Sequence, residues 1–209
     1  MKSWILRGLS KGSVTSGFPG NDPEDVPLWS TTPRKEMDLP ISCPTDAIRD
    51  GKVNMSLCIS CGLCSPSFHP DGNADTSIIR HTEKVFHHSF HLYLFDAGSC
   101  GACNSEIKSL SNPVYDMSRL GIFFASNPKH ADALLVVGVL SQGMKDALRR
   151  AYEDMPKPSL VFAVGACAIS GGIIGKSIEE AIPADVIVPG CPPNPFTILD
   201  ALLKSRGDR

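Results

Sequence analysis

Eight cysteines are the residues of this sequence whose type and spacing could do chemistry, and they fall into two groups of four with none left over. The C-terminal set consists of Cys100, Cys103, Cys167 and Cys191. The N-terminal set consists of Cys43, Cys58, Cys61 and Cys64. Four thiolates brought to one place are what an iron–sulfur cluster needs. The cysteine pattern therefore predicts two such clusters.

Disulfides and structural zinc are the alternative uses of these cysteines. The first ten residues have only a short, interrupted apolar stretch and no small-residue cleavage site, so we read no secretory signal and expect a cytoplasmic, reducing compartment. Zinc commonly takes its cysteines as two close pairs, and only Cys100 and Cys103 with two distant cysteines could imitate that pattern. The close triple at 58, 61 and 64 favours a cluster.

The elements that must position the C-terminal set are short apolar runs. Residues 92–95, 160–164 and 186–188 each stand just before a cysteine segment and read as strands. Loops that leave the carboxyl ends of parallel strands converge on one crevice. We therefore expect Cys100, Cys103, Cys167 and Cys191 to meet at one edge of a sheet.

Strand and helix patterns alternate through the C-terminal half, which predicts an α/β fold with a flavodoxin-like parallel sheet. The continuous apolar run 134–137 is typical of a strand covered on both faces. Ser141 is a plausible N-cap for the helix that follows it. The expected strands are 92–95, 121–124, 133–139, 160–164 and 186–188, and the expected helices are 105–110, 142–153 and 195–204.

The chain divides into three expected parts: an arm over 1–40, a small cysteine-bearing segment over 41–80 and the α/β domain over 88–209. The arm is rich in Gly, Pro, Ser and Thr, so we expect an extended tail or a strap on a partner subunit. The net charge of −2 gives no indication of a nucleic-acid partner. No run of eighteen apolar residues occurs, so no direct membrane span is expected.

Residues 41–65 resemble a bacterial-type ferredoxin reduced to one cluster. Two-cluster ferredoxins carry the run C-x2-C-x2-C-x3-C-P, whose Cys-Pro cysteine ligates the other cluster. Here Cys43-Pro44 comes first and the triple follows, while Phe68 stands where the fourth cysteine of the run would be. The resemblance implies a single [4Fe–4S] cluster held by the N-terminal set.

Residues 92–203 resemble the small subunit of [NiFe] hydrogenases, most closely the energy-converting, formate-hydrogenlyase-like branch. Three motifs carry the likeness: Asp96-Ala-Gly-Ser-Cys-Gly-Ala-Cys-Asn-Ser-Glu106, Val164-Gly-Ala-Cys-Ala168 and Pro189-Gly-Cys-Pro-Pro-Asn-Pro195. The related B-type subunit of complex I usually has adjacent cysteines at the first motif, whereas this chain has Cys-Gly-Ala-Cys. The resemblance implies a second [4Fe–4S] cluster on the C-terminal set. It also implies that Glu106 relays protons. The alternative is that Glu106 has no such role and is favoured at a helix N-terminus by the helix dipole.

The expected function is electron transfer within a multi-subunit complex. No cysteines remain for a nickel–iron site, so the resemblance implies a hydrogenase-type large subunit as partner, with further redox and membrane subunits, at the cytoplasmic face of a membrane. The alternative is a complex I-like subunit that donates electrons to quinone. A nickel analysis of the complex separates the two.

Two other features are given structural interpretations. The histidines 69, 81, 87, 88 and 91 could bind a metal, but we interpret them as linker or interface residues because the cysteines already make two complete sites. The stretch 171–177 resembles a phosphate-binding loop, but Ser170 stands where its first glycine is required. We therefore do not interpret this stretch as a nucleotide site.

Overall fold

A six-stranded sheet forms the centre of the C-terminal half in the computed structural model, which describes residues 15, 17–18, 33–37, 40–70, 77–86 and 88–208. The strands are β5 (Ile78–Ile79), β6 (Phe90–Asp96), β7 (Ile122–Phe124), β8 (Ala133–Val137), β9 (Leu160–Val164) and β10 (Val186–Val188). Their order is β5-β10-β9-β8-β6-β7, and all neighbours except β5 and β10 run parallel. Without β5 this is the flavodoxin-like order 2-1-3-4-5, so the predicted fold class is confirmed.

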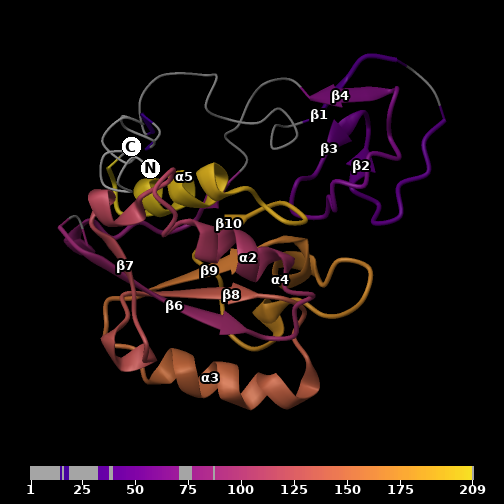
Figure 1. The fold of residues 1–209 in the computed structure, drawn as a ribbon. Helices are drawn as coiled ribbons and strands as arrows, with labels where there is room; N and C mark the ends of the chain where they lie inside the picture. Colours follow the sequence, from indigo (N-terminus) through magenta and orange to yellow (C-terminus); the bar gives the residue numbers. More distant parts are fainter. Residues whose placement is uncertain are drawn as a thin grey trace, which may run out of the picture.

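Helices cover both faces of the sheet (Figure 1). Helices α2 (Ala102–Ser109) and α5 (Pro195–Ser205) lie on one face, where Leu135 and Val137 share a buried cluster with Ile107 and Ile198. Helices α3 (Lys145–Glu153) and α4 (Ala166–Ser170) lie on the other, where Leu134 and Val136 pack with Leu148 and Ile169. Successive residues of β8 point to opposite faces, and both faces are covered, which explains the continuous apolar run in the sequence.

The predicted helix 195–204 occurs with its predicted start as α5, whereas the other two predicted helices start at different residues. Helix α2 begins at Ala102, three residues before the predicted start, so Cys103 lies in its first turn. The predicted helix 142–153 consists of a 3-10 turn, η6 (Gln142–Met144), followed by α3, and the Ser141 side chain makes no capping hydrogen bond. Further 3-10 turns are η3 (Lys84–Phe86), η4 (Met117–Leu120), η5 (Pro128–His130) and η7 (Ile178–Glu180).

The cysteine-bearing N-terminal segment contains two small antiparallel sheets. Strand β2 (Ile48–Arg49) pairs with β3 (Lys52–Val53), and β1 (Pro33–Lys35) pairs with β4 (Phe68–Pro70). Strand β1 belongs by sequence to the predicted arm, so the C-terminal end of the arm is part of this segment's structure. Most of the arm lies outside the described residues.

Phe18 is the described residue of the arm that contacts the α/β domain. Its side chain is 5% exposed, and its ring lies 5.4 Å from the ring of Phe196 in α5. The Arg119 guanidinium donates a 2.6 Å hydrogen bond to the Phe18 carbonyl oxygen. At this point the arm lies on its own chain, whereas the sequence interpretation considered a strap on a partner subunit.

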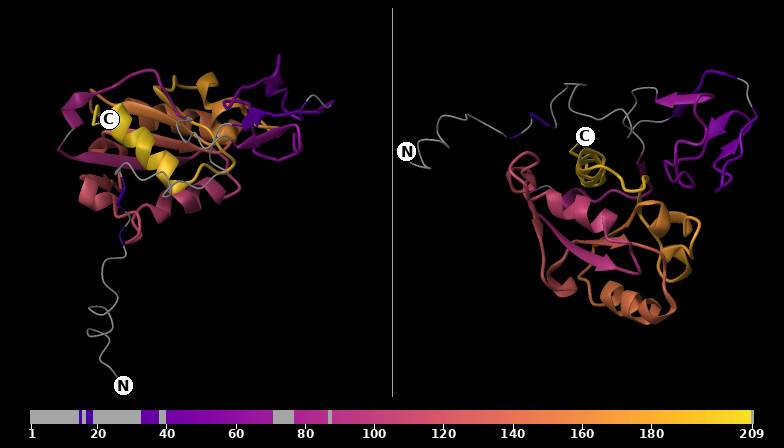
Figure 2. Two further views of the ribbon diagram at one scale, coloured as in Figure 1. Left: turned by 90° about the horizontal axis from the view of Figure 1, so that it is seen from above. Right: turned by 45° about the vertical axis from the view of Figure 1, so that its right-hand side comes forward.

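The connection from the N-terminal segment enters the sheet at the edge formed by β10. Strand β5 runs antiparallel to β10, with Ile78 opposite Ile187, and Arg80 N donates to Asp185 O at 2.8 Å. Residues 78–80, assigned by sequence to the ferredoxin-like segment, are thus joined to the α/β sheet. Because β5 starts beside the carboxyl end of β10, the N-terminal segment lies near the edge to which the parallel strands point (Figures 1 and 2).

Among the described residues, no helix is both long and apolar enough to cross a membrane.

Candidate functional site

The C-terminal set of cysteines gathers at the carboxyl edge of the sheet, as predicted. Cys100 and Cys103 follow β6, Cys167 lies in α4 directly after β9, and Cys191 follows β10. Cys103 and Cys167 are half-buried, while Cys100 and Cys191 are exposed. Three loops of the sheet therefore bring four thiols to one crevice.

Electrostatic effects between these thiols reflect their closeness. Burial, followed by the negative charges of Cys191, Cys167 and Cys100, raises the pKa of Cys103 to about 12. Burial first, and then the charges of Cys191 and Cys100, raise the pKa of Cys167. Burial first, and then the charge of Cys100, also raises the pKa of Cys191. Four thiolates repel one another here, and bound iron cations would remove that repulsion, since thiolate is the ligand form.

Gly165 shows how closely the three loops approach one another. A Cβ at this position would lie 2.6 Å from Cys103 Sγ and 3.5 Å from Gly190 O, and the backbone has φ +87°. Gly165 N donates to Val188 O at 2.9 Å, and Ala166 N donates to Gly190 O at 2.8 Å. Only glycine leaves space for the Cys103 sulfur between these loops, so the crevice fits a thiol-ligated group.

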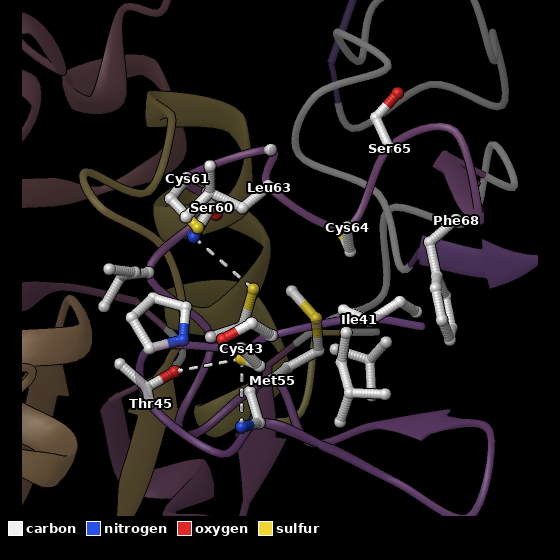
Figure 3. Close-up of a pocket in the computed structure, with 18 of the residues that line it drawn as sticks. Ile41, Cys43, Thr45, Met55, Ser60, Cys61, Leu63, Cys64, Ser65 and Phe68 are labelled. Atoms are coloured by element: carbon white, nitrogen blue, oxygen red, sulfur yellow. Dashed lines mark hydrogen bonds between the residues drawn. The ribbon is translucent and has the colours of Figure 1, made fainter. Parts of the chain in front are cut away.

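The N-terminal set lines a separate cavity of about 240 Å³. Figure 3 shows Cys43, Cys61 and Cys64 around it together with Met55 and Phe68. Ala47 N donates to Cys43 Sγ at 3.3 Å, and Ser60 N donates to Cys58 Sγ at 3.4 Å. Backbone donors to sulfur and apolar walls are the surroundings in which iron–sulfur clusters are held.

The pKa values of two thiols in this cavity move in opposite directions. Burial opposes ionisation of Cys43, but hydrogen bonds from Thr45, Ala47 and Ile48 lower its pKa. Burial raises the pKa of Cys64, and the charges of the other three cysteines of the set raise it further. The sequence grouping of these four cysteines is therefore matched by their proximity in space.

A second cavity, of about 460 Å³, lies between the two cysteine sets. Met55 and Ser60, which flank Cys58 in sequence, form one side, and residues 189–197 with Glu106 and Tyr115 form the other. Besides burial and the charge of Cys100, the charge of Cys58 contributes to the raised pKa of Cys191. Cys58 of the N-terminal set therefore lies close enough to Cys191 of the C-terminal set for their charges to interact.

Glu106 lines this second cavity. The alternative interpretation, that the helix dipole favours this residue, requires it to lie in the first turn of a helix. It is the fifth residue of α2, and the first turn of that helix contains no acidic residue. The influence of the helix dipole falls off within the first turn, which weakens the alternative interpretation of Glu106. Burial, and then the charge of Glu106, raises the pKa of the neighbouring Tyr115.

Three of these histidines lie beside carboxylates. His81 Nε2 lies 2.8 Å from Glu83, His91 Nδ1 lies 3.0 Å from Asp132, and His69 Nε2 lies 3.8 Å from Glu36. His87 lies outside the described residues. Among those that are described, no three His, Cys, Asp or Glu side chains converge on a point where one metal ion could bind.

The stretch 171–177 forms the turn that follows α4. Gly171 ends the helix with φ +84°, and Leu140 N donates to Lys176 O at 2.9 Å, which ties the turn to the loop after β8. This agrees with the structural interpretation of the glycines. The turn leaves Ile173 and Ile174 exposed beside the crevice.

The sequence analysis assigned no role to two residues of the site, Asp96 and Tyr115. Asp96 accepts four hydrogen bonds within the loop that carries Cys100 and Cys103. The sequence signal was present, since Asp followed closely by Gly and Ser favours a turn closed by the Asp side chain. Tyr115 had no such signal, because its place beside Glu106 depends on how the irregular segment after α2 folds back.

The fold and the site together define an α/β protein of the flavodoxin-like class with a thiol-lined crevice. Residues 100–205, half of the chain, match the family described as NADH ubiquinone oxidoreductase, 20 Kd subunit, and the chain belongs to this family. It is an electron-transfer subunit of an oxidoreductase, related to the 20 Kd subunit of complex I. The family to which the sequence resemblance of residues 92–203 pointed is therefore confirmed, and the hydrogenase branch within it stays a prediction.

Individual relatives match about half of the chain. An uncharacterised protein of Methanocaldococcus jannaschii is 40% identical over 121 residues, which are 56% of this chain and 82% of the relative. The B-type subunit of the NADH-quinone oxidoreductase of Desulfovibrio desulfuricans is 38% identical over 107 residues, 49% of this chain and 58% of the relative. A chain in the structure of the membrane-bound sulfane sulfur reductase, an archaeal respiratory membrane complex, is 29% identical with a TM-score of 0.51; the match covers 57% of this chain and 70% of that one.

Proposed function

We propose that this chain passes electrons through two [4Fe–4S] clusters between a catalytic large subunit and another redox partner. Cys100, Cys103, Cys167 and Cys191 would hold one cluster, and the N-terminal set, Cys43, Cys58, Cys61 and Cys64, would hold the other. The observation that carries the proposal is that each set of four thiols gathers at a place of its own, with a further cavity between the sets. Each cluster, when bound, would supply reversible one-electron transfer.

The residues of the chain have distinct tasks in this proposal. The thiolates ligate iron, and the backbone N–H groups of Ala47 and Ser60 donate to the sulfurs of Cys43 and Cys58. Such hydrogen bonds stabilise the more negative, reduced state and raise the potential of the centre. Cys58 and Cys191, whose charges interact, would lie on the electron path between the two clusters.

The number of clusters is tested by metal analysis of the purified complex. We expect about eight iron atoms and about eight acid-labile sulfides per chain, because two complete four-cysteine sets each take one [4Fe–4S] cluster. The iron of other subunits is subtracted by comparison with a complex in which Cys61 and Cys103 are both replaced by serine. A difference of only half the expected iron would mean that one set holds no cluster.

The proposed partner is a hydrogenase-type large subunit, within a complex at the cytoplasmic face of a membrane. The spacing Cys100-Gly-Ala-Cys103 favours this branch over complex I-type subunits, which usually have adjacent cysteines at this motif. A second candidate is electron donation to quinone, and the named quinone-oxidoreductase relatives favour it. Nickel at about one atom per large subunit would support the hydrogenase branch; a nickel-free complex whose clusters are reoxidised by quinone would support the second candidate.

Glu106 is proposed as a proton relay beside the large subunit. It is half-buried in the cavity next to Cys191 and Tyr115, where a carboxyl group can exchange protons with a partner. Glu106→Gln keeps the size but cannot titrate, so we expect turnover to fall by about a hundredfold while both cluster signals remain. Glu153→Gln, at the end of α3 and far from the cysteines in sequence and fold, is the control. Unchanged turnover in Glu106→Gln would remove the relay from the proposal and leave electron transfer intact.

A further inference from the structure

The loop between β6 and α2 is organised by one carboxylate. Asp96 Oδ1 accepts hydrogen bonds from Gly98 N at 2.9 Å and Ser99 N at 2.8 Å. Asp96 Oδ2 accepts from Ser99 Oγ and from Asn104 Nδ2, both at 2.7 Å. One side chain thus fixes both ends of the segment that contains Cys100 and Cys103.

Ser99 and Asn104 close this network around the two cysteines. Asn104 Nδ2 also donates to Ser99 Oγ at 3.0 Å, and Gly101 N donates to the same Ser99 oxygen at 3.1 Å. Ser99 directly precedes Cys100, and Asn104 directly follows Cys103. Each cysteine is therefore adjacent to a residue that Asp96 holds in place.

The arrangement is more than an ordinary turn or helix cap. The N-cap of α2 is Gly101, which has no side chain to cap the helix, so Asp96 acts on the loop from outside the helix. Committing Asn104 Nδ2 to Asp96 and Ser99 leaves the buried Asn104 Oδ1 without a partner in the described structure. An unsatisfied buried acceptor is unfavourable, and the loop tolerates it while keeping this geometry.

The rest of the loop is attached independently of Asp96. Ala97 N donates to Val137 O at 2.9 Å, Ser141 N donates to Ala97 O at 3.0 Å, and Val139 N donates to Gly98 O at 3.2 Å. These backbone bonds join residues 97–98 to β8 and the loop after it. Loss of the Asp96 carboxylate would release residues 99–104 and leave the sheet in place.

We propose that Asp96 is a positioning residue that holds Cys100 and Cys103 in a ligand-ready geometry before the crevice cluster binds. This inference rests on the proposed function, because it requires that the C-terminal set binds a cluster. Preorganised ligands give up less freedom on binding than ligands on a free loop. Asp96 therefore controls how firmly the crevice cluster is held, and its hydrogen bonds involve none of the residues that line the N-terminal cavity.

The test uses the assembled complex and variants in which Asp96 and its hydrogen-bond partner Asn104 are replaced singly or exchanged. In Asn104→Asp two carboxylates face each other, and in Asp96→Ala all four hydrogen bonds are lost. The double variant Asp96→Asn with Asn104→Asp restores the pair in reverse, since the introduced amide oxygen still accepts from the backbone and the introduced amide nitrogen donates to the new carboxylate. Asp132→Ala is the control, because Asp132 accepts a 2.7 Å hydrogen bond from His91 N at the opposite end of the sheet.

The measured quantities are the rate of iron release to a ferrous chelator and the paramagnetic resonance signals of the two reduced clusters. We expect Asp96→Ala and Asn104→Asp to release the crevice cluster about 10–100-fold faster, as changes around metal ligands usually do, and the double variant to return toward the wild-type rate. The N-terminal cluster serves as the internal reference in every variant.

Three outcomes would overturn the inference: wild-type release rates in both single variants, no recovery in the double variant, or equal losses of both clusters. If Asp96→Ala does not assemble, the comparison of Asn104→Asp with the double variant decides the question alone. A wild-type complex with no iron on the C-terminal set would instead contradict the proposed function, so the two failures are distinguishable.

Discussion

At the level of single residues, the two cysteine sets share no cysteine. The N-terminal cavity is lined by its own four cysteines and by none of the C-terminal set. Cys61→Ser should therefore remove the paramagnetic signal of the N-terminal cluster and leave the crevice signal unchanged, because Cys61 is exposed and lies in the N-terminal cavity alone. The measurement is electron paramagnetic resonance of the dithionite-reduced complex. Ser60→Ala is the control, because Ser60 donates to Cys58 through its backbone N–H. Loss of both signals in an assembled variant would indicate ligands shared between the sets.

The cysteine grouping could be predicted from sequence because it depends on residue type and spacing alone. The surroundings of the thiols could not. Asp96 binds residues that lie two, three and eight positions away, and this requires a loop conformation that spacing does not specify. Tyr115 reaches Glu106 only after the chain turns back behind α2. Side chains that act through tertiary contacts of loops leave little trace in a single sequence.

The loop between β9 and α4 depends on a glycine at the closest approach of three elements. In Gly165→Ala the new methyl group would meet Cys103 Sγ at 2.6 Å and strain a backbone with φ +87°. We expect this variant to lose the crevice cluster, or to hold it with an altered signal, while the N-terminal cluster persists. Gly143→Ala is the matched control, because nothing lies within 4 Å of its added Cβ. Iron content and the two cluster signals would be compared, and an unchanged crevice signal in Gly165→Ala would contradict the geometry.

The contact of Phe18 with α5 predicts that the arm contributes to the stability of the α/β domain. Phe18→Ala should lower the free energy of unfolding by about 3–5 kcal/mol, since it empties a buried site against Phe196. Phe123→Ala, in the edge strand β7 and 40% exposed, should cost much less. Denaturant unfolding of the two variants in the assembled complex gives the comparison. Equal effects would mean that Phe18 does not pack as the structure describes.

Secondary structure was predicted well where apolar runs are long and poorly where signals are short. Strands β8, β9 and β10 were found because their residues are continuously apolar and buried. Strand β5 was missed because it has two residues and its pairing with β10 depends on a contact between segments far apart in the sequence. The start of α2 was placed too late because Gly101, with φ +90°, begins the helix without a capping side chain.

For the molecule as a whole, the thiols of the crevice predict how the cluster-free form responds to pH. The folded-state pKa of Cys103 is raised to about 12, above the ordinary value of an unfolded thiol. A raised thiol pKa gives stability that is present below the unfolded pKa, about 8.5, and lost as the pH rises toward the folded value. We expect the cluster-free chain to unfold at lower denaturant concentration near pH ~9.5 than near pH ~7.5.

The cluster-loaded chain should change much less over this range, because its thiols are already deprotonated by iron. A cluster-free chain that is more stable at the higher pH would contradict this.

The entry of β5 beside β10 has a kinetic consequence. The chain leaves the N-terminal segment after Pro70 and joins the sheet at Ile78, next to the strand whose end carries Cys191. A separate ferredoxin would have to find its docking site by diffusion, at a rate that depends on its concentration and on ionic strength. Here the short covalent connection would keep the two proposed centres at an effective concentration in the millimolar range. Electron exchange between them should then follow first-order kinetics that neither dilution nor added salt slows.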